Sequence, residues 1–329
     1  MTTTENGGNA AVTEQGGIHG RAMLVSLTVS AWAARRFDRK TTEEVNREHA
    51  ASPNAGRYNK HLFADEAPSH KAACAAAGAV RGVFYQQTLP WSDEGWRLLP
   101  SANYFAFTEA MRKARSELGG AVTVFVADYP DLAEKAKAAL NDLWRAEDYP
   151  SAATVASKFG ARIAYSPVPS SGDFRLTLPD DERLEIERSV TERVRLATDA
   201  AMREAWDRLY KAVRRMYARL SARIEAEAEG QDKRLPAIHE SLVENLRETA
   251  DILGRLNVTG DEALEAMRQR VVTELAGIDA RSLRKDSATR ESAAKAAGAI
   301  LDAMADFYGA GAAGAIREFH DKDSEEDER

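Results

Sequence analysis

The stretch DDERLEIERSVTERVRLATDAAMREAWDRLYKAVRRMYARLSARIEAEAE (180–229) decides the fold class of the C-terminal half. It contains no proline or glycine, and acidic residues crowd its first turn, where they complement the helix dipole. Its apolar side chains recur mostly at spacings of three and four between Trp206 and Ile224. The pattern predicts one helix of roughly fifty residues, about 75 Å long if straight.

Shorter helical patterns follow this long helix. A second helix is expected over 238–256, and Thr259 and Glu262 have the spacing of a capping box that starts a third helix ending near residue 275. A fourth helix is expected from about 287 to 308. These partners are much shorter than the first helix, so we expect self-association to cover part of its apolar side.

The N-terminal half has a mixed pattern. AMLVSLTVSAW (22–32) alternates apolar and polar residues, which is typical of a half-buried strand. Residues 161–169 and 174–178 are expected to form two further strands joined by a turn. The prolines and the glycine of 89–104 predict a loop there.

Helices are expected in this half around 42–50, over 70–87 and over 105–118. Gly119 and Gly120 should interrupt the third of these, and Pro130 should open another helix that runs to about residue 144. The apolar run 121–129 is either a strand or a continuation of the helix, because periodicity cannot decide for so short a segment.

The expected fold class is therefore α+β: a small mixed domain with a short sheet, followed by a mainly helical region with one long helix. We divide the chain into a disordered tail (1–17), an α+β domain (18–178), a helical domain (179–315) and an acidic disordered tail (316–329).

Composition excludes several classes of protein. Of the 329 residues 44% are hydrophobic and 29% charged, which is too apolar for a wholly disordered chain. The net charge of −7 argues against a constitutively basic nucleic-acid coat, although a local basic site is compatible with it. There is no apolar run long enough to span a membrane and no secretory signal, and the single cysteine, Cys74, allows no internal disulfide. We expect a cytoplasmic protein in a bacterial host.

No catalytic motif occurs in the sequence context that its chemistry requires. The glycines of 309–314 match a dinucleotide-binding spacing but follow a helix rather than a strand. Ser282 and Lys285 match a hydrolase motif whose companion motifs are missing. The six histidines are scattered, and Cys74 lies in an alanine-rich helix, where a small packed side chain is the simpler interpretation. We therefore predict no enzyme activity, no cofactor and no metal.

A row of basic residues on the long helix is the main functional candidate. Its members recur at spacings of three or four and are expected to point away from the apolar side: Arg208, Lys211, Arg215, Arg219 and Arg223, with Arg214 nearby. Such a row can follow a phosphate backbone, because arginine binds phosphate in a bidentate way. The same pattern is also typical of a solvated helix face, with Glu204 and Asp207 as local partners.

Further candidate groups lie in the N-terminal half. Arg35 and Arg36 follow the first predicted strand and could extend a basic surface. Aromatic residues could stack on unpaired bases or form the core of a small domain, and we favour the core: Trp32, Trp91, Trp96, Tyr104 and Phe105.

Seven segments between residues 25 and 261 carry a resemblance to a known family: VSLTVSAW (25–32), GWRLLPSANYFAF (95–107), EDYPSAATVASKFG (147–160), YSPVPSSGDFRL (165–176), AMREAWDRLY (201–210), LVENLRETADIL (242–253) and LNVTGD (256–261). In these segments the chain resembles an uncharacterised protein family of tailed bacteriophages and prophages. The resemblance implies a gene context near MoxR/CobS-like AAA+ ATPases and DNA-metabolism genes. It assigns no catalytic residues.

Together these observations favour a non-enzymatic phage-type protein that binds nucleic acid, most simply single-stranded DNA, in replication or recombination. Two alternatives stay open. One is an adaptor or partner of a AAA+ ATPase, and the other is a structural or assembly protein that forms homo-oligomers.

Overall fold

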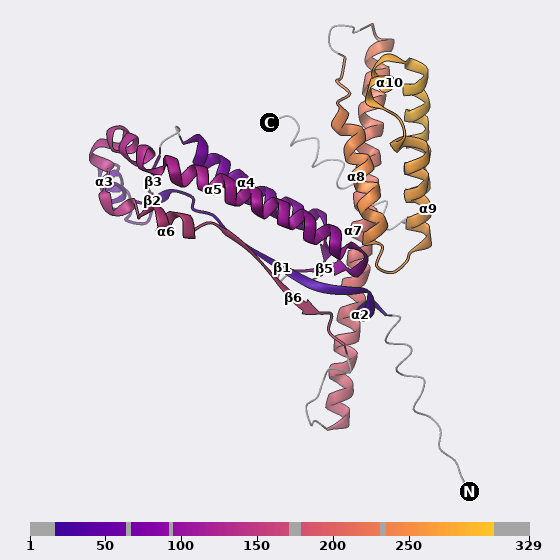
Figure 1. Ribbon diagram of the computed structural model, residues 1–329, viewed down its shortest axis with the longest axis horizontal. Coiled ribbons are helices and arrows are strands. Elements are labelled where there is room, and N and C mark those ends of the chain that lie inside the picture. Colours follow the sequence, from indigo (N-terminus) through magenta and orange to yellow (C-terminus); the bar gives the residue numbers. More distant parts are fainter. Residues whose placement is uncertain (1–16, 64–66, 92–94, 171–178, 231–234, 306–329) are drawn as a thin grey trace. The chain divides into compact units, whose positions relative to one another are not determined.

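The computed structural model describes residues 17–63, 67–91, 95–170, 179–230 and 235–305 (Figure 1). Contacts divide the chain into two compact units. Unit 1 holds Met1–Leu24, Thr88–Asn103 and Ser166–Arg329, and unit 2 holds Val25–Gln87 and Tyr104–Tyr165. This grouping differs from the predicted division at residue 178, because the segment after residue 88 packs with the C-terminal helices. Among the described residues, no helix combines the length and apolar character needed to cross a membrane.

The main sheet has four strands in the order β4-β5-β1-β6. The predicted strand at 22–32 is confirmed as β1 (Ala22–Ser30), and that at 161–169 as β6 (Gly160–Pro167). The loop predicted over 89–104 is wrong, because β4 (Leu89–Pro90) pairs antiparallel with β5 (Trp96–Pro100). Leu89 lies opposite Leu98 and both are fully buried, so apolar burial outweighs the turn-forming residues around them.

A second, two-stranded sheet lies in unit 2, where β2 (Arg35–Phe37) pairs antiparallel with β3 (Asn59–His61). The helix predicted around 42–50 is confirmed a few residues earlier, as α3 (Arg39–Glu48). Asp38 begins it as the N-cap and accepts a hydrogen bond from the backbone N–H of Thr41.

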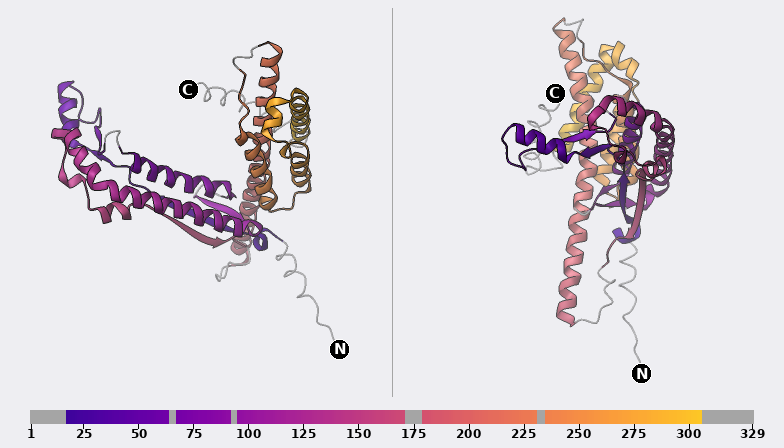
Figure 2. Two further views of the ribbon diagram at one scale, coloured as in Figure 1. Left: turned by 45° about the horizontal axis from the view of Figure 1, so that its top comes forward. Right: turned by 90° about the vertical axis from the view of Figure 1, so that its left-hand side faces the viewer.

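Two long helices form most of unit 2 and lie side by side in both views (Figure 2): α4 (Pro68–Gln86) and α5 (Tyr104–Leu140). The predicted interruption at Gly119 and Gly120 is wrong, and residues 121–129 are helical. The helix continues because Leu118, Phe125 and Tyr129 are all buried on one side of it. Pro130 also lies inside α5 rather than at a helix start.

Short elements complete unit 2 after α5: η2 (Asn141–Leu143), η3 (Ala146–Asp148) and α6 (Ala152–Ser157). Ten buried residues around Phe125 and Tyr129 form an aromatic-rich core here. Trp32 contacts this core through edge-on packing against Phe63, with ring centroids 5.6 Å apart. The core interpretation is therefore correct for Trp32.

Unit 1 is organised by α7 (Asp180–Ala228), the long helix that the sequence predicts. Short segments precede the helices in this unit, α2 (Ile18–Arg21) and η1 (Ser101–Asn103). The predicted second helix is confirmed as α8 (Glu240–Leu256), and a helix over 287–305 confirms the fourth as far as the structure describes it. Figure 1 shows α8, α9 and α10 beside the C-terminal half of α7.

The third predicted helix is α9 (Glu262–Val271), followed directly by the π-helical turn η5 (Val272–Ala276). Its N-cap is Asp261 rather than Thr259, because the Asp261 carboxylate accepts hydrogen bonds from the N–H groups of Ala263 and Leu264. A short helix that the sequence did not predict, α10 (Ala280–Lys285), comes next.

The core of unit 1 is continuous from the sheet into the helices. Leu209, Val213, Met216 and Leu220 of α7 are fully buried in it. Several predicted features lie outside the described residues: the strand at 174–178, the glycines at 309–314, most of the N-terminal tail and the acidic C-terminal tail.

Candidate nucleic-acid interface

The two ends of the predicted basic row are tied into unit 1. Arg208 Nε lies 3.1 Å from a Glu204 carboxylate oxygen, and its terminal nitrogen donates to the Thr88 carbonyl at 2.8 Å. Arg223 Nε lies 2.7 Å from Glu227. The two arginine side chains are only 20% and 16% exposed. The expectation that the whole row points outward and unneutralised is therefore wrong for Arg208 and Arg223, because their guanidinium groups hold local packing together.

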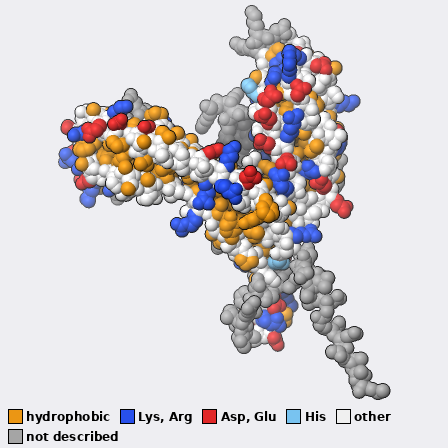
Figure 3. All heavy atoms as spheres, in the orientation of Figure 1, with side chains coloured by type: hydrophobic (Ala, Val, Ile, Leu, Met, Phe, Trp, Pro, Cys, Tyr) orange, Lys and Arg blue, Asp and Glu red, His pale blue; other side chains and the backbone are white. Residues whose placement is uncertain are grey.

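The middle of the row is more open. Lys211, Arg215 and Arg219 are exposed, and Arg214 is half-buried. Lys211 lies close enough to Asp207 for its charge to oppose the burial that raises the pKa of that carboxyl. Within the described part of the chain, Arg215 and Arg219 have no carboxylate within ion-pair distance. On the face drawn in Figure 3, basic and acidic side chains are interspersed over the helices of unit 1. The row thus reduces to two unpaired arginines on α7.

Arg35 and Arg36 belong to β2 of unit 2, whereas the row belongs to unit 1. Both side chains are exposed, and Arg36 Nε lies 3.3 Å from the buried carboxylate of Asp148. Arg36 lines a charged pocket of unit 2 whose lining does not include Arg35, and neither arginine belongs to the α7 row.

A second basic surface, which the sequence did not indicate, lies between α5 and β6 within unit 2. We call it the α5–β6 hollow. Its volume is about 410 Å³, and its lining residues are Thr108, Met111, Arg112, Arg115, Ser116, Ile163 and Tyr165. Arg112 and Arg115 are one turn apart on α5 and both exposed. Ile163 and Tyr165 are two residues apart on β6, so their side chains lie on the same face of the strand.

One exposed aromatic ring, that of Tyr165, lines the hollow, and a second, that of Phe105, lies about two turns before Arg112 on the same face of α5. Phe105, in the first turn of α5, is 82% exposed, and Tyr165 is 50% exposed. The Tyr104 ring packs edge-on against Phe105 with centroids 5.5 Å apart. Trp91 and Trp96, in contrast, pack against the core of unit 1. The core interpretation therefore fails for Phe105, which has too little protein around it.

The electrostatics of the hollow are positive. No carboxylate of the described residues lies within ion-pair distance of Arg112 or Arg115. Burial raises the pKa of Tyr165, the neighbouring Tyr104 adds to the rise, and the charge of Arg115 opposes it. The Tyr165 phenol thus stays protonated at neutral pH and can donate a hydrogen bond, while the arginines can bind anions.

A sequence signal for this hollow existed in two parts. Arg112 and Arg115 have helical spacing, and Tyr165 stands in a predicted strand. Only the pairing of the main sheet places β6 alongside the start of α5, 50 residues away in the chain. Sequence reasoning therefore had no basis for joining them.

Cys74 and His70 lie one turn apart on α4, with Sγ 3.5 Å from Nε2. The same Nε2 is 2.7 Å from the Trp32 carbonyl oxygen, so it must carry the proton and donate to that oxygen. It cannot then accept a proton from the thiol, and burial raises the pKa of Cys74. The pair packs rather than forming an activated nucleophile. Among the described residues, no three His, Cys, Asp or Glu side chains are grouped closely enough to hold a metal ion.

Comparison of the chain with protein-family models, curated proteins and solved structures finds no match. The resemblance to phage proteins therefore stays a prediction, and the functional argument depends on the geometry of the chain itself.

Proposed function

We propose that the protein binds single-stranded nucleic acid through the α5–β6 hollow. The observation that carries the proposal is that two exposed arginines, Arg112 and Arg115, which form no ion pair with the described residues, line one hollow with the exposed ring of Tyr165. The exposed Phe105 ring lies on the same face of α5 and can extend this surface. Guanidinium groups bind backbone phosphates, and aromatic rings stack on bases that are not paired.

Single strands fit this surface better than duplexes. In a duplex the faces of the bases are covered by their neighbours, so exposed aromatic rings would gain nothing from contact with it. A hollow of about 410 Å³ is within the size range of pockets that take small ligands, and it can hold one unstacked base. Because the whole chain carries a net charge of −7, binding must depend on such a local site. We place this activity in the handling of DNA strands during replication or recombination.

The decisive experiment replaces both arginines, Arg112→Gln together with Arg115→Gln, and measures the affinity for a single-stranded oligonucleotide at several salt concentrations. Each lost phosphate contact lowers the slope of log affinity against log salt by about 0.7. We expect a slope smaller by about 1.4 and an affinity at least tenfold weaker at low salt. The matched control is Lys135→Gln, an exposed lysine near the other end of α5, which should change neither quantity.

Tyr165→Leu tests the stacking contribution separately. Loss of one stacked base costs about 1–3 kcal/mol, so the affinity should fall about fivefold or more while the salt slope stays the same. A third variant, Arg215→Glu with Arg219→Glu, tests the α7 row. If only that variant loses affinity, the interface lies on α7 and the assignment to the α5–β6 hollow is wrong. If none of the variants changes affinity or slope, neither surface is the interface, and if the unmodified protein shows no measurable affinity, nucleic-acid binding itself is rejected.

A further inference from the structure

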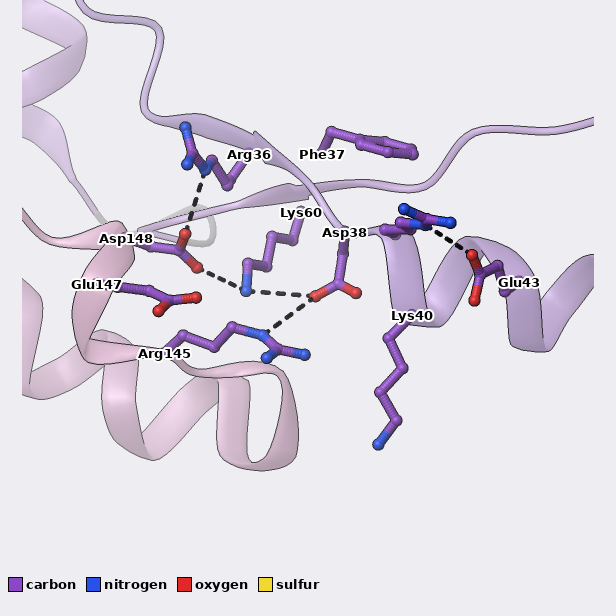
Figure 4. A pocket seen from close by; sticks show the side chains of 10 residues that line it. Arg36, Phe37, Asp38, Lys40, Glu43, Lys60, Arg145, Glu147 and Asp148 are labelled. Atoms are coloured by element: carbon purple, nitrogen blue, oxygen red, sulfur yellow. Dashed lines mark hydrogen bonds and ion pairs between the residues drawn. The ribbon is translucent and has the colours of Figure 1, made fainter. Parts of the chain in front are cut away.

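A second pocket lies in unit 2, between β2, the first turn of α3, β3 and the η3 segment (Figure 4). Its volume is about 370 Å³. Charged side chains dominate its lining, and they form two layers: a buried inner layer and an exposed outer layer that faces solvent. We call it the β2–α3 pocket.

The inner layer consists of Lys60 between Asp38 and Asp148. Lys60 Nζ lies 2.7 Å from an Asp148 oxygen and 3.3 Å from an Asp38 oxygen, and it donates to the Leu143 carbonyl at 2.7 Å. All three charged side chains are at most 4% exposed. With one positive and two negative charges, this layer carries a net charge of −1.

The outer layer begins with two arginines that reach the inner carboxylates through Nε. Arg36 Nε lies 3.3 Å from Asp148, and Arg145 Nε lies 3.8 Å from Asp38. Their side chains are 67% and 43% exposed. Figure 4 shows the Arg145 guanidinium below Asp38, on the side where Lys40 also lies. The terminal nitrogens of the two arginines point in different directions: those of Arg145 extend to the side on which Lys40 lies, whereas those of Arg36 lie on the opposite side of Asp148 (Figure 4). The Arg145 guanidinium thus presents two donors in a geometry that suits an oxyanion.

The outer layer carries more positive than negative charge, because Arg36, Arg39, Lys40 and Arg145 stand against Glu43 and Glu147. Arg39 lies there too, but Glu43 neutralises it at 2.7 Å. The Lys40 ammonium is 74% exposed and only loosely paired, 3.8 Å from Glu44. Buried ion pairs seldom stabilise a fold more than apolar packing of the same volume would. The inner layer is therefore better explained by its effect on the arginines, which it holds in fixed positions.

We propose that the β2–α3 pocket binds the phosphate group of a phosphate ester, with Arg145 and Lys40 as the ligands, because their terminal nitrogens lie on the same side of Asp38 (Figure 4). The guanidinium group can give a bidentate pair of hydrogen bonds to phosphate oxygens, and the ammonium adds a second positive charge. The volume exceeds the need of a bare phosphate and leaves room for the attached group. This site is separate from the α5–β6 hollow and does not depend on it.

The test uses the full chain with three probes: adenosine 5′-monophosphate, adenosine, and a single-stranded oligonucleotide. Binding is measured by titration at constant ionic strength. We expect saturable binding of the monophosphate and none of adenosine. In Arg145→Gln with Lys40→Gln the affinity for the monophosphate should fall at least tenfold, because a hydrogen bond to a charged group is lost at each position. The matched control, Arg47→Gln, replaces an exposed arginine of α3 outside the pocket and should change it less than twofold.

A second variant guards against a folding defect. The Lys40 side chain has no contact with the inner layer, so the single variant Lys40→Gln should fold normally. Its affinity for the monophosphate should be about threefold weaker or more. If the pocket variants weaken the binding of the oligonucleotide as well, the phosphate that the pocket binds belongs to a nucleic-acid strand. If they weaken only the binding of the monophosphate, it belongs to a small phosphate ester. Both results support the site. Absence of saturable phosphate binding to the unmodified protein, or equal weakening by Arg47→Gln, would overturn it.

Discussion

Replacing Lys60 by Met should reveal how the charged network at the β2–α3 pocket contributes to stability. Methionine keeps most of the side-chain volume and removes the ammonium. Lys60 Nζ then no longer lies between Asp38 and Asp148, and the hydrogen bond to the Leu143 carbonyl is lost. Two carboxylates, each at most 4% exposed, remain without the cation that separates them.

The expected cost follows from what the carboxylates retain. Removing one partner of a buried ion pair typically costs about 3–5 kcal/mol. Here Asp148 keeps Arg36 at 3.3 Å, and Asp38 keeps the N–H of Thr41 at 3.0 Å. The loss should therefore lie at or just below the lower limit of this range, at about 2–3 kcal/mol in the free energy of unfolding at pH 7.

The loss should depend on pH with a definite sign. Hydrogen bonds from Thr41, together with Lys60, hold the pKa of Asp38 below 3.8, against the effect of burial. Ionised Asp38 thus stabilises the native protein above about pH 4, and this stabilisation disappears as the pH falls through its folded pKa. Without Lys60 the pKa rises and protonation becomes easier. The difference between the variant and the unmodified protein should be largest near pH 7 and shrink below pH 4.

Urea unfolding at pH 7 and at pH 3.5 measures this difference, and hydrogen exchange of peptides from 35–63 shows whether unit 2 is the part affected. Lys135→Met, an exposed lysine on α5, is the control and should change the free energy by less than about 0.5 kcal/mol. A loss below about 1 kcal/mol at pH 7, or the same loss at both pH values, would refute the reasoning.

Three other outcomes can be measured. Gly120→Ala should raise the free energy of unfolding by up to about 1 kcal/mol in urea titrations, because a Cβ there meets no atom within 4 Å and α5 is helical at this point; a loss would show that the helix bends there. Asp261→Ala should lower it by about 1–3 kcal/mol, since the carboxylate caps α9 and accepts a hydrogen bond from the Trp206 indole at 3.0 Å; thermal unfolding without a change would contradict that role. Arg268 lowers the pKa of Glu265 to about 2. The stabilisation of the folded protein by ionised Glu265 should therefore be lost only as the pH drops from about 4.5 towards 2. A carbon NMR titration of Arg268→Gln should show the pKa of Glu265 moving back towards 4.5.

Elements whose pattern is local and strong were predictable. The absence of proline and glycine over 180–229 specified α7, and strict alternation specified β1. The strength of a local signal did not suffice elsewhere. Gly119 and Gly120 lower the helix propensity of α5, yet burial of Leu118 and Phe125 on the same side outweighs it.

The candidate sites divide in the same way. The sequence by itself determined that Arg208 to Arg223 share one face of a helix, because a spacing of three or four residues does so in any α-helix. It could not determine that Arg208 donates to the Thr88 carbonyl and pairs with a carboxylate, or that Arg223 donates to the Pro236 carbonyl. Because of these contacts, the two arginines at the ends of the row are not free to bind a ligand. Both the α5–β6 hollow and the β2–α3 pocket join segments that lie 50 to about 100 residues apart. Only the tertiary structure decides which distant segments come into contact, since such contacts follow from how strands pair and helices pack rather than from the spacing of residues along the chain.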